Sequence, residues 1–266
     1  MEREEKLMKS NKWKFLLTGA ATLTLLTACT QASSQSATKS NTAQTTATST
    51  SNSKTDSSNY FTDKDKDTSY DESTASTVKL SGSSANVSGD GVAVSGSTVT
   101  ISKAGTYVIS GESDGVQIKV EAGDSDDVHI ILKGVSMTNT NAPISATKAG
   151  HVYLTLAEGT TNTLSDSSSN NDEDADAVIF SKGDLTINGS GTLNIDAKKN
   201  NGIKANDTLH ITGGTYKITA VGDAFNVNDE LNITGTTMTI DADEDAVKVD
   251  NDEDTSVGTM YLSDNK

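Results

Sequence analysis

The chain has 266 residues and a formal net charge of −16, with 37 acidic side chains against 21 lysines and arginines. This excess of acid disfavours nucleic acid as a partner, because phosphate binding depends on clustered lysine and arginine. It favours cations as partners instead.

The first 28 residues are predicted to be a secretory signal. Lysines precede an apolar run over 15–28 that is too short for a comfortable transmembrane helix. The run ends in Leu26-Thr27-Ala28-Cys29, which resembles the lipobox of bacterial lipoproteins, in which the cysteine becomes the lipidated first residue. We therefore expect a lipid anchor on Cys29, facing the extracellular side of the membrane of a Gram-positive bacterium. An ordinary signal with an incidental cysteine is the alternative, and as the only cysteine it can form no disulfide within the chain.

Residues 29–76 are predicted to be a disordered linker. Residues 30–59 are almost wholly Ser, Thr, Asn, Gln and Ala, without a large apolar residue. Such a segment cannot bury enough apolar surface to fold. The folded domain is therefore expected to occupy residues 77–266.

Residues 90–266 carry a repeat. Its regular copies contain apolar pairs separated by one polar residue, such as Leu209/Ile211 and Leu231/Ile233, and they start at Asp176, Asn201, Asp223 and Asp245. Short strands with alternate side chains inward, joined by Gly or Asx corners, predict an all-β fold in which each copy is one coil of a parallel β-helix.

Further coils are predicted upstream, starting at Asp90, Asp114 and Asn141, although the register of coil 141–175 stays open. Together they suggest about seven coils with three strands each. The sequence stops at Lys266 partway through a coil without a visible cap. We therefore expect either a protein partner at that end or a copy truncated relative to longer relatives.

The stretch 96–166 and the coils after it resemble a family of bacterial carbohydrate-binding β-helix lipoproteins. The likeness is carried by segments 99–111, 128–134 and 156–166, and by the repeated Asp-Ala and Leu-x-Ile-x-Gly patterns. The resemblance implies a right-handed parallel β-helix similar to pectate lyases, bound calcium, and recognition of plant or other polysaccharides, acidic ones included, without cleavage.

Two corners of the predicted coils collect aspartates. Stacking would place Asp223 beside Asp245, and Asp207 beside Asp229, at one strand spacing of about 4.8 Å. Calcium binds oxygen ligands at about 2.3–2.6 Å, so one ion fits between two such carboxylates. The predicted calcium ligands are Asp176, Asp207, Asp223, Asp229, Asp243 and Asp245. Alternatively, the Asx side chains only shape the turns by bonding to nearby backbone.

Between these corners lies the predicted outward row of the first strand, formed by Ile179, Lys204, Asn226 and Lys248, with Val178 and Phe180 expected to point inward. Lys204, Asn226 and Lys248 are the candidate carbohydrate-binding residues, because lysines beside bound calcium suit a uronate chain. Alternatively, these lysines only neutralise neighbouring aspartates. A second row on the next face is expected to be exposed and aromatic, and it contains Thr100, His129, Tyr153, Thr186, His210, Asn232 and Tyr261.

Three functions are compatible with these patterns. The first is a surface lipoprotein that binds polysaccharide with the help of calcium and does not cleave it. The second is a structural or adhesive surface protein with a protein partner. The third is a polysaccharide lyase, which the composition disfavours: pectate lyases use arginine as the base, and Arg3 in the signal is the only arginine. Lys204 or Lys248 would have to replace it.

Overall fold

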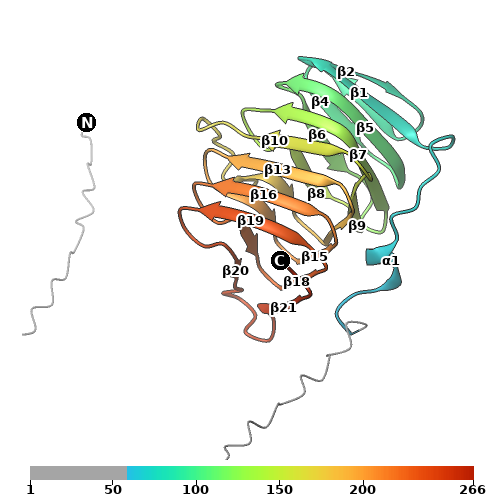
Figure 1. The fold of residues 1–266 in the computed structure, drawn as a ribbon. Helices are drawn as coiled ribbons and strands as arrows, with labels where there is room; N and C mark the ends of the chain where they lie inside the picture. Colours follow the sequence, from blue (N-terminus) through green and yellow to red (C-terminus); the bar gives the residue numbers. More distant parts are fainter. Residues whose placement is uncertain (1–58) are drawn as a thin grey trace, which may run out of the picture. The chain divides into compact units, whose positions relative to one another are not determined.

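The computed structural model describes residues 59–266, so the predicted signal, Cys29 and most of the predicted linker lie outside the described residues. The secondary structure of the described part is β-strands in stacked, mostly parallel sheets, with one short α-helix, α1 (Asp63–Lys66) (Figure 1). This arrangement is that of a parallel β-helix. Within residues 59–266, no helix is long and apolar enough to cross a bilayer.

The strands form three stacks, which we call the first, second and third faces. The first face contains β3 (Val92–Ser95), β4 (Thr98–Ile101), β6 (Gln117–Glu121), β8 (Ile144–Lys148), β11 (Ala177–Ser181), β14 (Asn201–Ala205), β17 (Phe225–Val227) and β20 (Lys248–Val249). The second contains β9 (His151–Leu156), β12 (Leu185–Gly189), β15 (Thr208–Thr212), β18 (Glu230–Thr234) and β21 (Thr259–Ser263). The third contains β10 (Thr161–Ser165), β13 (Thr192–Ala197), β16 (Thr215–Ala220) and β19 (Thr237–Ala242).

Two long strands, β5 (Gly105–Asp114) and β7 (Asp127–Thr138), run from the second face into the third. The first half of β7 pairs with β9, and its last residues pair with β10. The second and third faces therefore belong to one continuous sheet, and the first face closes the rod as a separate sheet.

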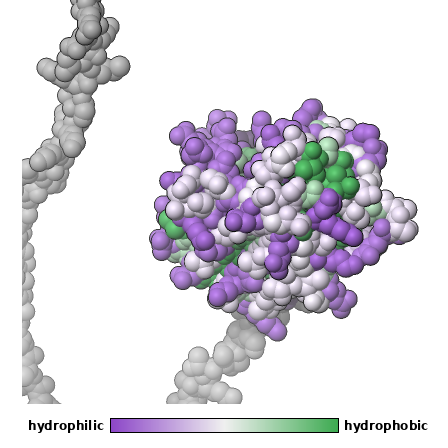
Figure 2. Space-filling model, turned by 90° about the horizontal axis from the view of Figure 1, so that it is seen from above, coloured by the Kyte–Doolittle hydropathy of each residue, from purple (hydrophilic) through white to green (hydrophobic). Residues whose placement is uncertain are grey.

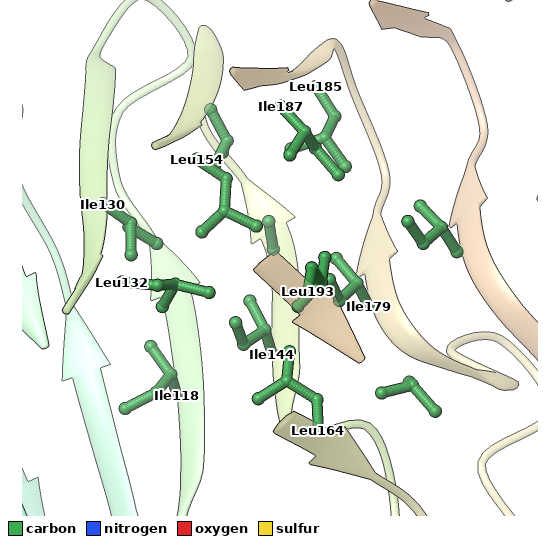
Figure 3. Close-up of a cluster of buried hydrophobic side chains, with 14 of the residues drawn as sticks. Ile118, Ile130, Leu132, Ile144, Leu154, Leu164, Ile179, Leu185, Ile187 and Leu193 are labelled. Atoms are coloured by element: carbon green, nitrogen blue, oxygen red, sulfur yellow. The ribbon is translucent and has the colours of Figure 1, made fainter. Parts of the chain in front are cut away.

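The predicted stacking of equivalent residues is confirmed. Leu185 pairs with Leu209 and Leu209 with Leu231 on the second face, while Tyr216 lies between its partners from β13 and β19 on the third. These side chains and their neighbours fill one interior, shown in Figure 3 for ten labelled residues. Each buried apolar side chain contributes about 1.5–3 kcal/mol. Ordering the backbone costs about 1–2 kcal/mol per residue, so a coil is stable only against its neighbours.

The amino-terminal end differs from the prediction. The segment starting at Asp90 is not a parallel coil, because β3 and β4 pair antiparallel as a hairpin across Gly96, whose φ is 60°. A two-residue turn of this kind favours positive φ, which glycine adopts without strain. A second antiparallel pair, β1 (Ser76–Gly82) with β2 (Ser84–Ser88), lies beside β5 and closes this end. Figure 2, which views the molecule from above Figure 1, shows mainly hydrophilic and weakly polar residues with small hydrophobic patches.

The register of β11 also differs from the prediction. Ile179 pairs with Ile203 in the core, and Phe180, not Ile179, lies in the outward row beside Lys204. Phe180 is nevertheless buried, because the insertion after β10 covers it and it packs against Ala142 and Ala175. An apolar residue on the outer side of a strand is stable only under such a cover.

The fold begins upstream of the predicted boundary at residue 77. Residues 60–75, which we call the strap, pack along the outer side of the second face, with α1 against β12 and β15 (Figure 1). Phe61 and Asp65 of the strap are buried. Helix α1 starts with a capping box in which Thr62 and Asp65 satisfy each other's backbone N–H groups.

Candidate functional site

The first corner contains a ladder of Asx side chains. Asn201 Oδ1 accepts a hydrogen bond from the Asp223 N–H (3.1 Å), and Asp223 Oδ1 accepts one from the Asp245 N–H (3.0 Å). The predicted adjacency of Asp223 and Asp245 is therefore confirmed. The second oxygen of Asp223 accepts from Asn226 Nδ2 at 2.7 Å, and the side chain is 2% exposed. Protein donors thus contact both oxygens of Asp223, which favours the turn-forming alternative for this carboxylate over a metal ligand.

Beside this ladder, the insertion between β10 and β11 forms a hollow. Asp166, the first residue of the insertion, is fully buried and accepts from the Lys198 N–H (2.6 Å) and from Asn170 Nδ2 (3.2 Å). Burial raises the pKa of the Asp166 carboxyl, and these two hydrogen bonds oppose the shift. The insertion is thereby fixed to the neighbouring coil.

Polar side chains line this hollow: Asn170, Asn171, Asp172, Glu173, Asp176, Lys199 and Asn200. Asp176 binds Lys204 Nζ at 2.6 Å and also accepts from Asn200 Nδ2. Carboxylates accept hydrogen bonds from hydroxyl groups, while amides and ammonium groups donate to them. The hollow can therefore hold a ligand that is rich in hydroxyl groups.

The predicted row of Lys204, Asn226 and Lys248 lies in register on the first face. Each member contacts a carboxylate: Lys204 contacts Asp176, Asn226 contacts Asp223, and Lys248 lies 3.7 Å from its nearest carboxylate oxygen, on Asp250. The structure thus brings the three candidates together. The positive charges of Lys204 and Lys248 are partly balanced by carboxylates at the neighbouring corners.

The second corner stacks Asp207 and Asp229, as predicted, since the Asp229 N–H donates to the Asp207 carbonyl at 3.2 Å. Asp184, which was not predicted as a site residue, lies near Asp207 and Asp229 in the same group of carboxylates. Loss of solvation raises the pKa of the Asp207 carboxyl, and the charges of Asp184 and Asp229 add to the shift. Asn251 Nδ2 donates to Asp229 Oδ1 at 2.7 Å. Within the described residues, none of Asp184, Asp207 and Asp229 forms an ion pair within 4 Å, although the charge of Lys182 opposes the rise in the pKa of Asp207.

The remaining predicted metal ligand, Asp243, is exposed beyond β19. Within residues 59–266, no group of three or more His, Cys, Asp or Glu side chains is arranged to hold a metal ion. The predicted ligands therefore form pairs and ladders instead of a closed coordination sphere.

The second predicted row is covered, which differs from the expectation that it is exposed. The strap lies over the part of the row on the second face, where Tyr153, Thr186 and Asn232 are buried. Thr100 does not belong to this row, because β4 pairs with β6 on the first face. A signal for this cover exists in the sequence: Tyr60-Phe61 are large apolar residues next to a polar stretch, directly before a capping box. The linker prediction, which was based on composition, did not consider these two residues and was wrong for residues 60–75.

Comparison with known proteins agrees with this architecture. A family model described as "Carbohydrate-binding domain-containing protein" matches residues 95–266. A carbohydrate-binding domain-containing protein of Acetivibrio thermocellus is 39% identical over 126 residues, which are 45% of this chain and 44% of that protein. The chain thus spans less than half the length of this relative.

Among solved structures, the gadolinium derivative of the polysaccharide lyase-like protein from C. thermocellum superposes with a TM-score of 0.68. It shares 33% identity, with 71% of this chain and 79% of that chain covered. Since the family model covers most of the stacked strands, the chain belongs to the carbohydrate-binding domain-containing protein family.

Proposed function

We propose that the protein binds polysaccharide on its first face and does not cleave it. The observation that carries this proposal is the polar hollow of the first corner, which opens beside the row of Lys204, Asn226 and Lys248. A glycan chain needs an extended line of donors and acceptors, and parallel stacking supplies one at a spacing of about 4.8 Å. Family membership supports the same class of ligand.

We further infer that the glycan is acidic and that calcium assists its binding. The lysines of the row are already partnered, so a uronate carboxylate must share them or reach a cation. Asp207 and Asp229 offer a carboxylate pair, and its mutual repulsion would be relieved by a cation. Because no three described side chains form a metal site, calcium would be shared between this pair and a glycan carboxylate.

Hard cations such as calcium prefer oxygen ligands, which a carboxylate pair and a uronate carboxylate both supply. The proposal predicts that calcium alone changes the melting temperature little, and that calcium with polygalacturonate raises it. Calcium that stabilises the protein equally with and without the glycan would contradict a bridging role.

The glycan site is tested by titration calorimetry with oligogalacturonate, in calcium and in a chelator. Asn171→Ala/Lys199→Ala removes two exposed groups of the hollow and should weaken binding about tenfold, equivalent to about 1.4 kcal/mol. Lys217→Ala, on an exposed strand position of the third face, is the matched control and should bind as wild type does. Equal binding by all three proteins would refute the first-face site.

A polysaccharide lyase is the second candidate, favoured by the lyase-like relative. β-Elimination needs a base at the uronate C5 proton, and of the two lysines considered for this role, Lys204 is bound to Asp176 at 2.6 Å and Lys248 lies 3.7 Å from Asp250. We therefore expect no unsaturated product during prolonged incubation with polygalacturonate. Ultraviolet absorbance from such a product would overturn the binding-only proposal.

Attachment to the cell surface through a lipid on Cys29 completes the proposal. The protein should take up labelled fatty acid in its host, and Cys29→Ala should not. An adhesive role with a protein partner is the remaining alternative. Retention on a protein matrix that survives a chelator, without retention on glycan, would support that role.

A further inference from the structure

The strap is attached in two different ways along its length. Residues 70–75 are held by apolar contacts, because Tyr70 and Ala75 pack against a small cluster of Val108, Ile131 and Ala157. Residues 60–68, which we call the polar half, contain three Asp and two Lys. They are held by hydrogen bonds and charge, and by aromatic contacts of Tyr60 and Phe61 with Tyr261 and His210. The two halves thus differ in what attaches them.

Beneath the polar half lies a shelf of outward side chains on β12, β15 and β18, which we call the polar shelf: Thr186, Asn188, His210, Thr212 and Asn232. Thr186 and Asn188 are fully buried under the strap. A sheet face whose only role is to be covered would normally be apolar, since buried polar groups are costly unless fully paired. Here His210 Nδ1 and Asn232 Oδ1 are buried without a hydrogen-bond partner in the described part of the chain.

The strap places a carboxylate on this shelf. Asp65 Oδ1 accepts a hydrogen bond from Thr186 Oγ1 at 2.6 Å, and Asp65 Oδ2 lies 3.2 Å from His210 Nδ1, although the pair is poorly aligned for a hydrogen bond. Burial alone raises the pKa of the Asp65 carboxyl, but His210 and the hydroxyls of Thr186 and Thr62 outweigh it and hold the pKa well below its usual range. The shelf thus stabilises a buried negative charge.

The strap also places oxygen acceptors and a ring there. Asn188 Nδ2 donates to the carbonyl oxygens of Asp65 (3.1 Å) and Asp67 (3.0 Å), and Asn232 Nδ2 donates to the Tyr60 carbonyl at 3.0 Å. The Tyr60 ring stacks on Tyr261, with 3.8 Å between centroids and an interplanar angle of 4°. A carboxylate, a line of oxygen acceptors and a flat ring face are the groups that an acidic sugar presents.

We propose that the polar shelf is a second binding surface for acidic saccharides, and that the polar half of the strap is a built-in competitor covering it. A uronate carboxylate would replace that of Asp65, and a sugar ring would replace Tyr60 on Tyr261. The inference rests on the proposed function, because it assumes that the ligand is a glycan. The apparent affinity of the shelf is then its intrinsic affinity multiplied by the fraction of molecules in which the strap is open.

Asp67 and Ser69 form an exposed local turn between the two halves. Asp67 Oδ1 accepts from both the backbone N–H (2.9 Å) and the hydroxyl (2.6 Å) of Ser69, and these bonds do not involve the shelf, whereas the Asp67 carbonyl accepts from Asn188. Opening at this turn would break the contacts of Asp65 and Tyr60 and leave those of Tyr70 and Ala75 intact.

The experiment uses the full chain and the substitution Asp65→Ala, with Asp63→Ala as the matched control on an exposed position of the same helix. Hydrogen exchange of residues 60–68 measures release of the strap, and calorimetry measures binding of oligogalacturonate and of a neutral oligosaccharide of equal length. We expect D65A to exchange faster and to bind the acidic oligomer on the order of tenfold more tightly, without an equal gain for the neutral one.

Adding His210→Gln to D65A should abolish the gain while the strap remains released. Faster exchange in D65A without tighter binding would overturn the proposal. If Asp65→Ala leaves residues 60–68 protected, Tyr60→Ala/Phe61→Ala/Asp65→Ala, which changes only the strap, is measured in the same way and judged by the same outcomes.

The two proposals are separable. Asn171→Ala/Lys199→Ala should weaken binding by the wild-type protein without changing the gain caused by Asp65→Ala. Binding by the released variant alone would retain the shelf and refute the first-face site. Binding that is equal in wild type and the released variant, and that is weakened only by Asn171→Ala/Lys199→Ala, would retain the first-face site and refute the shelf.

Discussion

Asp223 offers the sharpest test of how the corners work. Its two oxygens accept from the Asp245 N–H and from Asn226 Nδ2, and the side chain is buried. Asp223→Ala removes both acceptors. A hydrogen bond to a charged group contributes about 1.5–3 kcal/mol, and Asn226 is partly exposed and can turn to water, so we expect a net loss of about 3 kcal/mol.

For a folded unit of this size, each kcal/mol shifts the melting temperature by about 2–4 °C, so Asp223→Ala should melt about 6–12 °C lower. Asp223→Asn is the matched control, because Asn201 performs the same task one coil earlier with an amide oxygen. It keeps the acceptor for Asp245 and should cost less than about 1 kcal/mol.

Thermal melting followed by circular dichroism, in calcium and in a chelator, distinguishes the ladder from a metal ligand. The ladder predicts the same drop in both buffers for Asp223→Ala and almost none for Asp223→Asn. If Asp223→Asn melted as low as Asp223→Ala and both lost a calcium-dependent gain, the carboxylate would be a metal ligand and the ladder interpretation would be wrong.

Three further predictions concern the core, the insertion and the strap. Leu209→Ala leaves a cavity between Leu185 and Leu231 and should destabilise the protein by about 2–5 kcal/mol in urea unfolding; a change below about 1 kcal/mol would contradict the stacking. Phe180→Ala should expose the insertion, so proteolysis within 166–176 should accelerate more than elsewhere, and uniform acceleration would argue against local cover. Burial alone lowers the pKa of His210, but Asp65 on α1 and Glu230 on β18 outweigh burial and raise it above the ordinary value. The protonated imidazole therefore stabilises the closed strap fully below about pH 6.5, and this contribution is lost as pH rises through the raised pKa. Hydrogen exchange at residues 60–68, corrected for its intrinsic pH dependence, should accelerate over that range, and His210→Gln should flatten the profile.

The local sequence pattern was sufficient to predict residue pairing where one coil resembles the next. The pairing of Leu209 with Leu231, and the contact between Asp223 and Asp245, follow from the period, because parallel strands stack equivalent residues one spacing apart. The candidate row of Lys204, Asn226 and Lys248 could be predicted for the same reason.

The pattern failed where burial depends on distant segments. Alternation alone cannot separate Ile179 from Phe180, since both are apolar, and a slip of one residue exchanges the two faces of a strand. The insertion decides the register by covering Phe180 from outside. The hollow that this insertion forms could likewise not be predicted from the repeat, because four of its lining residues, 170–173, belong to the insertion.

The sequence by itself therefore determined the stacked parallel architecture, the inward columns and the acidic corners, since each follows from a short-range repeat. Only the tertiary structure decided which outer surfaces are open. The strap covers the second face through contacts more than 120 residues apart, such as Asp65 with Thr186, and no local periodicity encodes a contact of that range.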